Sequence, residues 1–248
     1  MIPEPLQYLL FVGFAALMFL LRLDARRFSA AEWDTEDGDW RIWLPRLSWY
    51  AAGVALGLVI FALHPSPVSE LNLTLAPDRG EAMLLGLVYG GAGVVGAFVL
   101  AVLINGRLDF PRPGRYPGGV VFAIGTAFFD EFLFRGVLLG LLLGLGLPEW
   151  LAVGSAAFIY AGAIRAVTGS RGLPLLLNWM IIGVIGGVLV LLTGGIAAAF
   201  VGHAITRFSF FMTMGTPRRA AVEQVQPRYR GTGDGGAYII GPHDPRRG

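Results

Sequence analysis

Hydrophobic residues gather in seven long stretches of the chain, which short polar segments separate. The stretches cover residues 5–21, 47–63, 82–104, 118–145, 149–166, 173–192 and 194–214. Each is near the roughly 20 residues that a helix needs to cross the hydrocarbon core of a bilayer, and the fourth is long enough to tilt or break. The pattern predicts an all-α protein, a polytopic transmembrane helical bundle of about seven spans.

Composition agrees with a membrane protein. Of the 248 residues, 55% are hydrophobic and 15% are charged, and the mean hydropathy is +0.64. These values exclude an ordinary soluble domain. The sequence contains no cysteine, which excludes disulfides, thiolate catalysis and cysteine-ligated metal. The first partner that we expect is therefore the lipid bilayer.

All nineteen cationic side chains are arginine, because the chain contains no lysine. Almost all arginines outside the apolar stretches fall on alternate polar segments, which by the positive-inside rule predicts an N-terminus outside and a C-terminus in the cytoplasm. Arg22, Arg26 and Arg27 follow the first stretch, the reverse of a secretory signal, so we expect that stretch to remain as a span. The pI of about 9.2 therefore does not indicate a nucleic-acid partner. The distribution of arginines predicts a multi-pass protein of the cytoplasmic (inner or plasma) membrane.

The polar segments predict three parts of the chain. Residues 1–80 hold two transmembrane helices and a cytoplasmic loop, 28–46, in which acids alternate with tryptophans. Such a loop suits the headgroup boundary, where indoles anchor and acids stay in water, and a partner-binding loop is the alternative. Residues 81–214 form the membrane core. Residues 215–248 are rich in Arg, Gly and Pro and lack apolar periodicity, so we expect a disordered cytoplasmic tail.

Charged residues lie inside the fourth stretch, where Asp130, Glu131 and Arg135 are surrounded by Phe, Leu and Gly. An ionised carboxylate at the bilayer centre costs roughly 2.5–3.5 kcal/mol even on lenient scales, so such groups usually persist because they serve a function. Glu131 and Arg135 share a helical face and can neutralise each other, whereas Asp130 points about 100° away. The alternative to a functional site is a structural ion pair between helices.

The seventh stretch carries His203 and Arg207, which are again four residues apart on one face. With a rise of about 1.5 Å per residue, Asp130 lies roughly 18 Å and His203 roughly 16 Å from the cytoplasmic ends of their spans. Tyr160 in the fifth stretch reaches a similar level. The depths predict a shared polar site, with a satisfied packing histidine as the alternative.

Glycines recur every four residues in three stretches. Such repeats of small residues let helices in lipid associate by close approach of their backbones. They are Gly86 with Gly90, Gly136 with Gly140 and Gly144, and Gly183 with Gly187. We expect these glycines to pack helices tightly around the buried charges.

The run Asp-Glu-x-x-x-Arg-Gly at 130–136 is similar to the Glu-Glu-x-x-x-Arg signature of the CAAX-protease and bacteriocin-processing family, the Abi or type II CAAX prenyl protease-like group of intramembrane endopeptidases. The family's later Gly-rich span and His-x-x-x-Asn helix resemble 183–187 and 203–207. The resemblance covers roughly 81–212. It implies a CAAX-protease-like membrane core that hydrolyses membrane-embedded or lipidated peptides.

Three functional positions of the family differ in this chain. The first Glu of the signature, taken to activate water in the family, falls on Asp130. The His of a Phe-x-x-x-His element falls on Gly162, and the final Asn falls on Arg207, a permanent charge. The unchanged positions are Glu131, Arg135 and His203. The resemblance therefore implies a degenerate active-site set.

The candidate catalytic residues are Asp130, Glu131, Arg135, His203 and Arg207. Peptide hydrolysis needs water held against a base, for which Asp130 or Glu131 is the candidate, and donors for the oxyanion, for which His203 or Arg207 is the candidate. We expect no metal, because zinc needs three protein ligands and the two adjacent acids diverge on a helix. No other cofactor is indicated.

Two functions stay open. The first is an intramembrane endopeptidase, and the second is a family member without turnover that serves as a scaffold or accessory subunit of a membrane complex. The missing second-motif His favours the scaffold. A carrier that uses the buried acids and His203 as a proton relay fits the charges but not the order of the motifs. The expected partners beyond lipid are a membrane peptide substrate or a membrane protein.

Overall fold

The computed structural model describes residues 4–30, 40–106, 108, 110–168 and 172–214. These residues belong to one compact unit, which ends at Gly215. The predicted tail 215–248 and the acidic part of the predicted loop, 31–39, lie outside the described residues. The proposed division of the chain at residue 80 stays a prediction.

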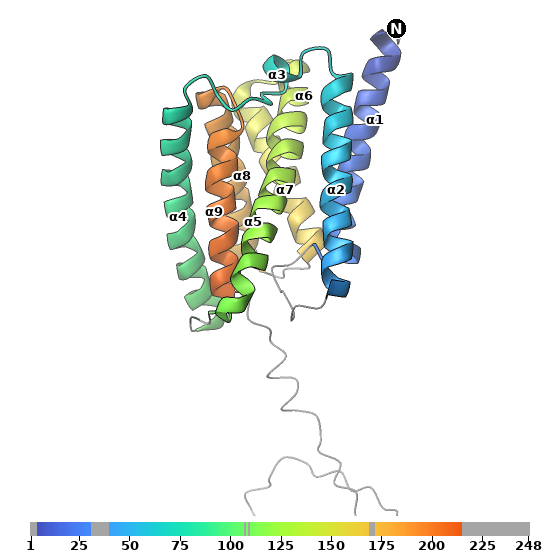
Figure 1. Cartoon of the computed structure of the whole chain (residues 1–248). Coiled ribbons are helices and arrows are strands. Elements are labelled where there is room, and N and C mark those ends of the chain that lie inside the picture. The colour runs from blue at the N-terminus through green and yellow to red at the C-terminus, as the bar shows by residue number, and fades with distance from the viewer. Residues whose placement is uncertain (1–3, 31–39, 107, 109, 169–171, 215–248) are drawn as a thin grey trace, which may run out of the picture. The chain divides into compact units, whose positions relative to one another are not determined.

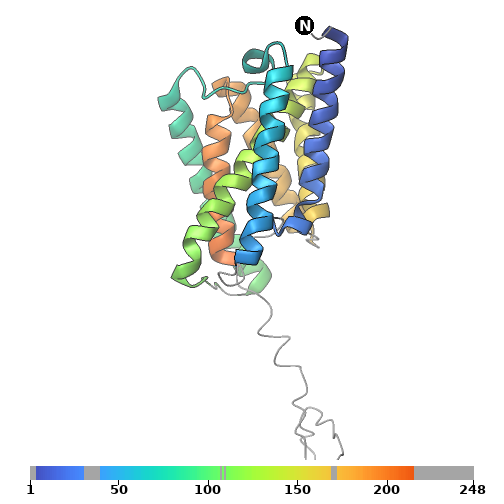
Figure 2. The ribbon, with the colours of Figure 1, turned by 45° about the vertical axis from the view of Figure 1, so that its right-hand side comes forward.

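Within the described ranges the chain is helical and contains no strand, so the all-α fold class is confirmed. The long segments are α1 (Glu4–Leu23), α2 (Trp40–Leu63), α4 (Arg79–Asn105), the run of α5 (Tyr116–Asp130), η3 (Glu131–Leu138) and α6 (Leu139–Gly144), then α7 (Glu149–Thr168), α8 (Leu173–Thr193) and α9 (Ala197–Met214). Short helices η1 (Ala25–Phe28), α3 (Pro67–Glu70) and η2 (Pro113–Arg115) lie in the connections. The long helices stand side by side, and consecutive ones run in opposite directions (Figures 1 and 2).

Five of the described helices are long and apolar enough to cross a bilayer, which makes this a multi-pass membrane protein. They are α1, α2, α4, α7 and α8. The run α5–η3–α6 and helix α9 lie alongside them (Figure 1), but these two segments carry most of the buried charged residues. The count of seven spans and the orientation of the termini therefore stay predictions.

The second helix begins earlier than the apolar pattern predicts, at Trp40 rather than residue 47. The predicted loop is therefore wrong over its last residues. The pattern missed this turn because Pro45 and arginines interrupt it. In the structure the guanidinium of Arg46 donates to the carbonyl oxygen of Ser29 from Nε at 2.8 Å and Nη2 at 2.5 Å. It also lies 5.5 Å from the ring centroid of Trp43. These contacts fix the start of α2 against the end of η1.

Close helix contacts form at two of the three glycine repeats. A Cβ added at Gly90 in α4 would lie 2.7 Å from Ile205 Cδ1 in α9, and one at Gly183 in α8 would lie 2.7 Å from Ala157 Cβ in α7. At Gly136 and Gly140 the neighbours are instead the connection between α2 and α4. The expected tight packing is thus observed for α4 with α9 and for α7 with α8, whereas the third repeat receives a connecting segment.

The α4–α9 contact predicts a position-specific effect. Gly90→Leu is expected to destabilise the protein by about 1–3 kcal/mol, because the new side chain overpacks against Ile205. Thermal unfolding in mild detergent measures the change. Gly91→Leu is the matched control, since a Cβ at Gly91 meets no described atom within 4 Å. Equal effects of the two substitutions would show that α4 does not depend on close approach at Gly90.

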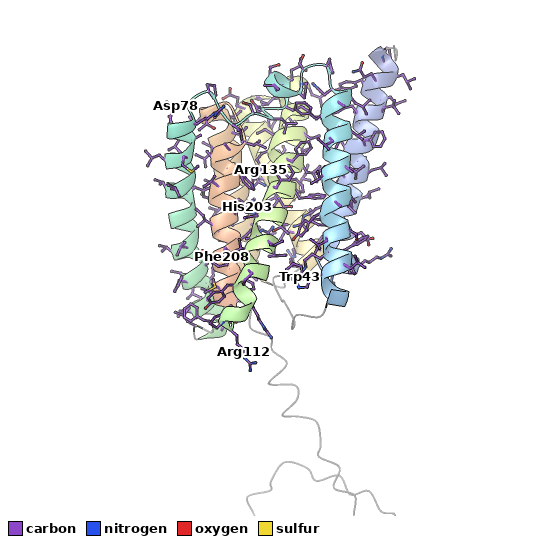
Figure 3. The ribbon with its side chains drawn as sticks, in the orientation of Figure 1. Trp43, Asp78, Arg112, Arg135, His203 and Phe208 are labelled. Carbon is purple, nitrogen blue, oxygen red and sulfur yellow. The ribbon has the colours of Figure 1, made fainter. Side chains whose placement is uncertain are left out.

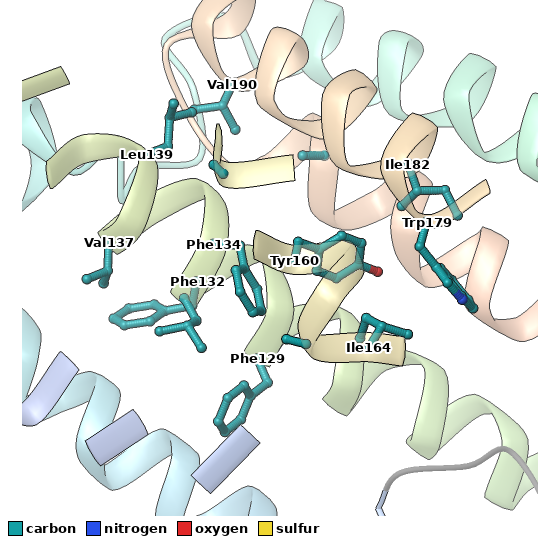
Figure 4. Packing of buried hydrophobic residues seen from close by; sticks show 14 of the residues in the cluster. Phe129, Phe132, Phe134, Val137, Leu139, Tyr160, Ile164, Trp179, Ile182 and Val190 are labelled. Atoms are coloured by element: carbon teal, nitrogen blue, oxygen red, sulfur yellow. The ribbon is translucent and has the colours of Figure 1, made fainter. Parts of the chain in front are cut away.

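Aromatic side chains fill the interior around the middle of the bundle. The rings of Phe134 and Tyr160 meet edge to face at 5.2 Å (Figure 4). Trp49 stacks on Phe129 with centroids 4.3 Å apart. Burial of such rings contributes a large share of packing energy and fixes the neighbouring helices in register. These rings surround the buried polar residues of the candidate site with apolar side chains.

Candidate buried active-site cluster

The structure brings all five predicted site residues together. Asp130 ends α5, Glu131 and Arg135 lie on η3, and His203 and Arg207 lie on α9. Each of these residues is at most 1% exposed. Arg135 and His203 lie near the middle of the bundle (Figure 3). Two further residues, Arg22 of α1 and Tyr160 of α7, join them, and we call these seven residues the polar cluster.

The local winding of the helix changes at the acids. Residues Glu131–Leu138 form a π-helical segment between α5 and α6, so the fourth stretch stays helical through its charged centre. A π-helical turn is wider than an α-helical turn and is found frequently at functional sites. The segment still places Glu131 and Arg135 within ion-pair distance, with Oε1 and Nη1 3.2 Å apart.

Asp130 is held by two arginines from different helices. Its Oδ1 accepts from Arg22 Nε at 2.5 Å, and its Oδ2 accepts from Arg22 Nη2 at 3.2 Å and from Arg207 Nη2 at 2.6 Å. Each carboxylate oxygen therefore accepts at least one hydrogen bond from a guanidinium group. Asp130 joins the last turn of α1 to α9 through its own helix.

Glu131 has one oxygen in use and one unpaired. Its Oε1 lies 2.5 Å from His203 Nδ1 and 3.2 Å from Arg135 Nη1. Its Oε2 is buried and has no hydrogen-bond partner among the described residues. Arg135 also donates from Nη2 to the carbonyl oxygen of Ile182 in α8 at 3.2 Å and lies 4.2 Å from the ring centroid of Tyr160. Oε2 is thus the carboxylate oxygen of the cluster that is left to bind another group.

The hydrogen bonds of His203 determine its tautomer. Arg207 Nε donates to His203 Nε2 at 3.1 Å, and a guanidinium N–H is only a donor. His203 Nε2 must therefore accept, so the ring proton lies on Nδ1 and is donated to Glu131 Oε1. The Tyr160 hydroxyl lies 3.1 Å from the same Nε2 and accepts from Arg207 Nη2 at 3.4 Å. The imidazole is neutral and oriented from both sides.

The charges of the cluster do not cancel. Among its described members, three arginines face two carboxylates and a neutral imidazole. Indole faces offset part of the excess, since the guanidinium of Arg22 lies 5.8 Å from the ring centroid of Trp49 and that of Arg207 lies 4.8 Å from that of Trp179. Each arginine therefore has both an anionic and an aromatic neighbour.

The donor set does not fit a metal. One imidazole and one carboxylate meet at His203 and Glu131, while the neighbouring Asp130 turns to arginines. A zinc site needs three protein ligands. Among the described residues, no three His, Asp or Glu side chains gather as a potential metal site.

The alignment on Phe158 and Gly162 does not hold in space. Gly162 lies on the exposed face of α7, and a Cβ added there would meet no described atom within 4 Å. A histidine at that position would point away from the polar cluster. The residue of α7 that reaches the cluster is Tyr160, which is 0% exposed. The sequence places Tyr160 at the right depth, but the motif alignment pointed to Gly162, two residues further along the helix.

Arg22 is the residue that the sequence analysis missed. From the sequence, Arg22 is one of the arginines after the first apolar stretch that predict the orientation of the termini. The structure instead places it in the last turn of α1 with 0% exposure. Its partner Asp130 lies 108 residues away in sequence. One feature of the sequence could have identified Arg22. It directly follows the first apolar stretch, which contains no acidic residue to pair with it.

Comparison with known families agrees with the motif. Residues 113–209 match the family model described as type II CAAX prenyl endopeptidase Rce1-like. The predicted resemblance to the CAAX-protease family is confirmed over these residues, which are fewer than the predicted 81–212. The match includes the cluster residues of α5, η3, α7 and α9, whereas Arg22 lies outside it. No curated protein and no solved structure matches the chain.

Proposed function

We propose that this CAAX-protease-like membrane protein does not hydrolyse peptides and acts as a membrane scaffold or accessory subunit. The observation that carries the proposal is the occupation of both Asp130 oxygens by Arg22 and Arg207. A general base must present a lone pair to the proton that it removes. Asp130, at the position of the family's first Glu, instead uses three of its roughly four acceptor sites on two guanidinium groups.

Burial supports the same proposal. The acids, His203 and Arg207 are all 0% exposed, so the cluster is sealed from solvent in this conformation. Hydrolysis requires access for water and for a peptide. The guanidinium of Arg207, where the family has a neutral amide, is packed on Trp179 and bonded to Asp130. Such a network suits the joining of helices better than the turnover of a substrate.

A buried network of this kind gives the bundle a single arrangement. Breaking one buried ion pair typically costs about 3–5 kcal/mol, because a charge is left uncompensated. The cluster links α1, α5, η3, α7, α8 and α9 through side-chain contacts. We infer that the residues at the family's active-site positions hold these helices in a fixed platform for a membrane partner.

Intramembrane hydrolysis is the second candidate, and one atom favours it. Glu131 Oε2 is a buried carboxylate oxygen without a described hydrogen-bond partner, and a catalytic role is one explanation for such an atom. In this mechanism Glu131, oriented by the Nδ1–H of His203, activates water. The side chains of Tyr160 and Arg207 donate to the oxyanion. The substrate is then a membrane-embedded or lipidated peptide.

Cleavage assays separate the two functions. Purified protein in proteoliposomes is expected to release no product from prenylated and unprenylated membrane peptides beyond the background of Glu131→Gln, measured by mass spectrometry. Asp130→Asn and Glu149→Gln, an exposed acid at the start of α7, serve as comparisons, and size-exclusion profiles check the folding of each variant. Cleavage that depends on Glu131 would overturn the scaffold proposal and establish the second candidate.

A further inference from the structure

An apolar groove lies along α1, α2 and the short helix η1. Its volume is about 810 Å³. It is lined by Leu17, Leu20, Leu21, Leu23, Asp24, Phe28, Ala52, Ala55 and Leu56. The walls are leucines from the last turns of α1, and the small alanines of α2 keep it open. The lining spans about 10 Å of helix from Leu17 to Asp24, which is a substantial part of one leaflet of the hydrocarbon core.

The groove has one polar end. Asp24 lines it there, and Arg27 Nε lies 3.0 Å from Asp24 Oδ1 with 81% of the arginine side chain exposed. Arg26 is also exposed on the same short helix η1. Among the described residues, η1 and the residue before it therefore carry two exposed guanidinium groups and one carboxylate next to the apolar lining.

We propose that this groove binds an anionic glycerophospholipid, with one acyl chain along the leucines of α1 and the phosphate on Arg27 and Arg26. The arrangement of an apolar channel and a cationic end complements both parts of such a lipid. A zwitterionic lipid has no net negative charge to match the arginines. Its cationic headgroup would also need a carboxylate, and Asp24 is already paired with Arg27. Arginines near a membrane surface each contribute about a factor of five in affinity for anionic lipid.

The proposal makes Asp24 a competitor of the lipid. The carboxylate of Asp24 contacts Nε of Arg27. A phosphate on the remaining Nη donors of Arg27 therefore meets a nearby negative charge that lowers its affinity. Asp24→Asn keeps the size of the side chain and removes its charge. This substitution is expected to raise affinity for the anionic lipid while the groove itself is unchanged. A purely apolar groove would not respond in this way.

Lipid titration of delipidated protein in detergent, followed by native mass spectrometry, tests the proposal. Phosphatidylglycerol is expected to bind more tightly than phosphatidylcholine with the same chains, and Arg26→Gln/Arg27→Gln is expected to weaken phosphatidylglycerol binding roughly tenfold to thirtyfold. Ala55→Phe, which fills the groove, should weaken both lipids alike. Soluble glycerol phosphate should not compete, because it lacks the acyl chain.

The matched control is Arg112→Gln/Arg165→Gln, which removes one exposed arginine before η2 and one exposed arginine in the last turn of α7. Equal losses for the two double variants would overturn the proposal in favour of general electrostatic attraction. Unchanged binding by Ala55→Phe would overturn the assignment of the acyl chain to the groove. If Ala55→Phe instead changes the oligomeric state, the groove receives a helix of a second copy, and the lipid proposal is wrong.

Discussion

Asp130→Asn is expected to lower the free energy of unfolding by about 3–5 kcal/mol, because it breaks a buried ion-pair network. The substitution leaves two buried guanidiniums, those of Arg22 and Arg207, without their shared carboxylate. Denaturation in mild detergent, followed by circular dichroism, measures the change. Arg22→Met is expected to cost less, because Asp130 then keeps its contact with Arg207.

Asp24→Asn is the matched control for this experiment. It makes the same chemical change in an exposed ion pair, where the Asp24 side chain is 42% exposed. Exposed pairs contribute about 0–1 kcal/mol. A loss on Asp130→Asn no greater than that on Asp24→Asn would mean that the Asp130 contacts do not hold α1 to the core, and the scaffold proposal would lose its main support.

Much of the fold follows from the apolar pattern alone. Runs of about 20 apolar residues permit few structures in a bilayer, because backbone groups must be satisfied within each segment. The pattern therefore predicted the long helices well. It failed at the start of α2, where Trp40, Arg41 and Pro45 are helical but not continuously apolar. Hydropathy reports contact with lipid, whereas helices extend into the boundary region as long as their backbone bonds are made.

The meeting of Asp130, Glu131 and His203 was predictable because burial of charge is costly in lipid and depth follows from helix rise. The identity of the residue that pairs with Asp130 was not. Arg22 lies on a helix outside the family match, and only the three-dimensional packing of α1 against η3 and α7 brings it near. Local spacing carries no information on such a contact.

Tyr160 illustrates a signal that was present but not used. Buried positions of α7 recur with helical spacing at Ala152, Ala156, Tyr160, Ile164 and Val167. Gly162 falls outside this stripe. The inward face of a helix is fixed by its period of 3.6 residues, so the small-residue periodicity identifies Tyr160 as the inward side chain. The family motif was aligned on Phe158 alone, and this alignment selected a residue on the wrong face of α7.

A second large effect is expected at the other carboxylate. Glu131→Gln leaves Arg135 in the bundle interior without an anionic partner and is expected to cost about 3–5 kcal/mol of unfolding free energy. Arg135→Met removes the opposite charge and is expected to cost a similar amount, since Glu131 then faces only a neutral imidazole. The methionine can still pack on the ring of Tyr160.

The double variant Glu131→Gln/Arg135→Met decides between a structural and a catalytic role for this pair. With both charges removed, it is expected to be more stable than either single variant, because uncharged replacements of a buried ion pair are often close to neutral. Glu149→Gln controls for the loss of a carboxylate at an exposed position. Additive losses would show that the two charges are not coupled. If Glu131→Gln instead leaves stability unchanged while it abolishes a measurable peptide cleavage, the carboxylate serves the chemistry of the second candidate rather than the integrity of the bundle.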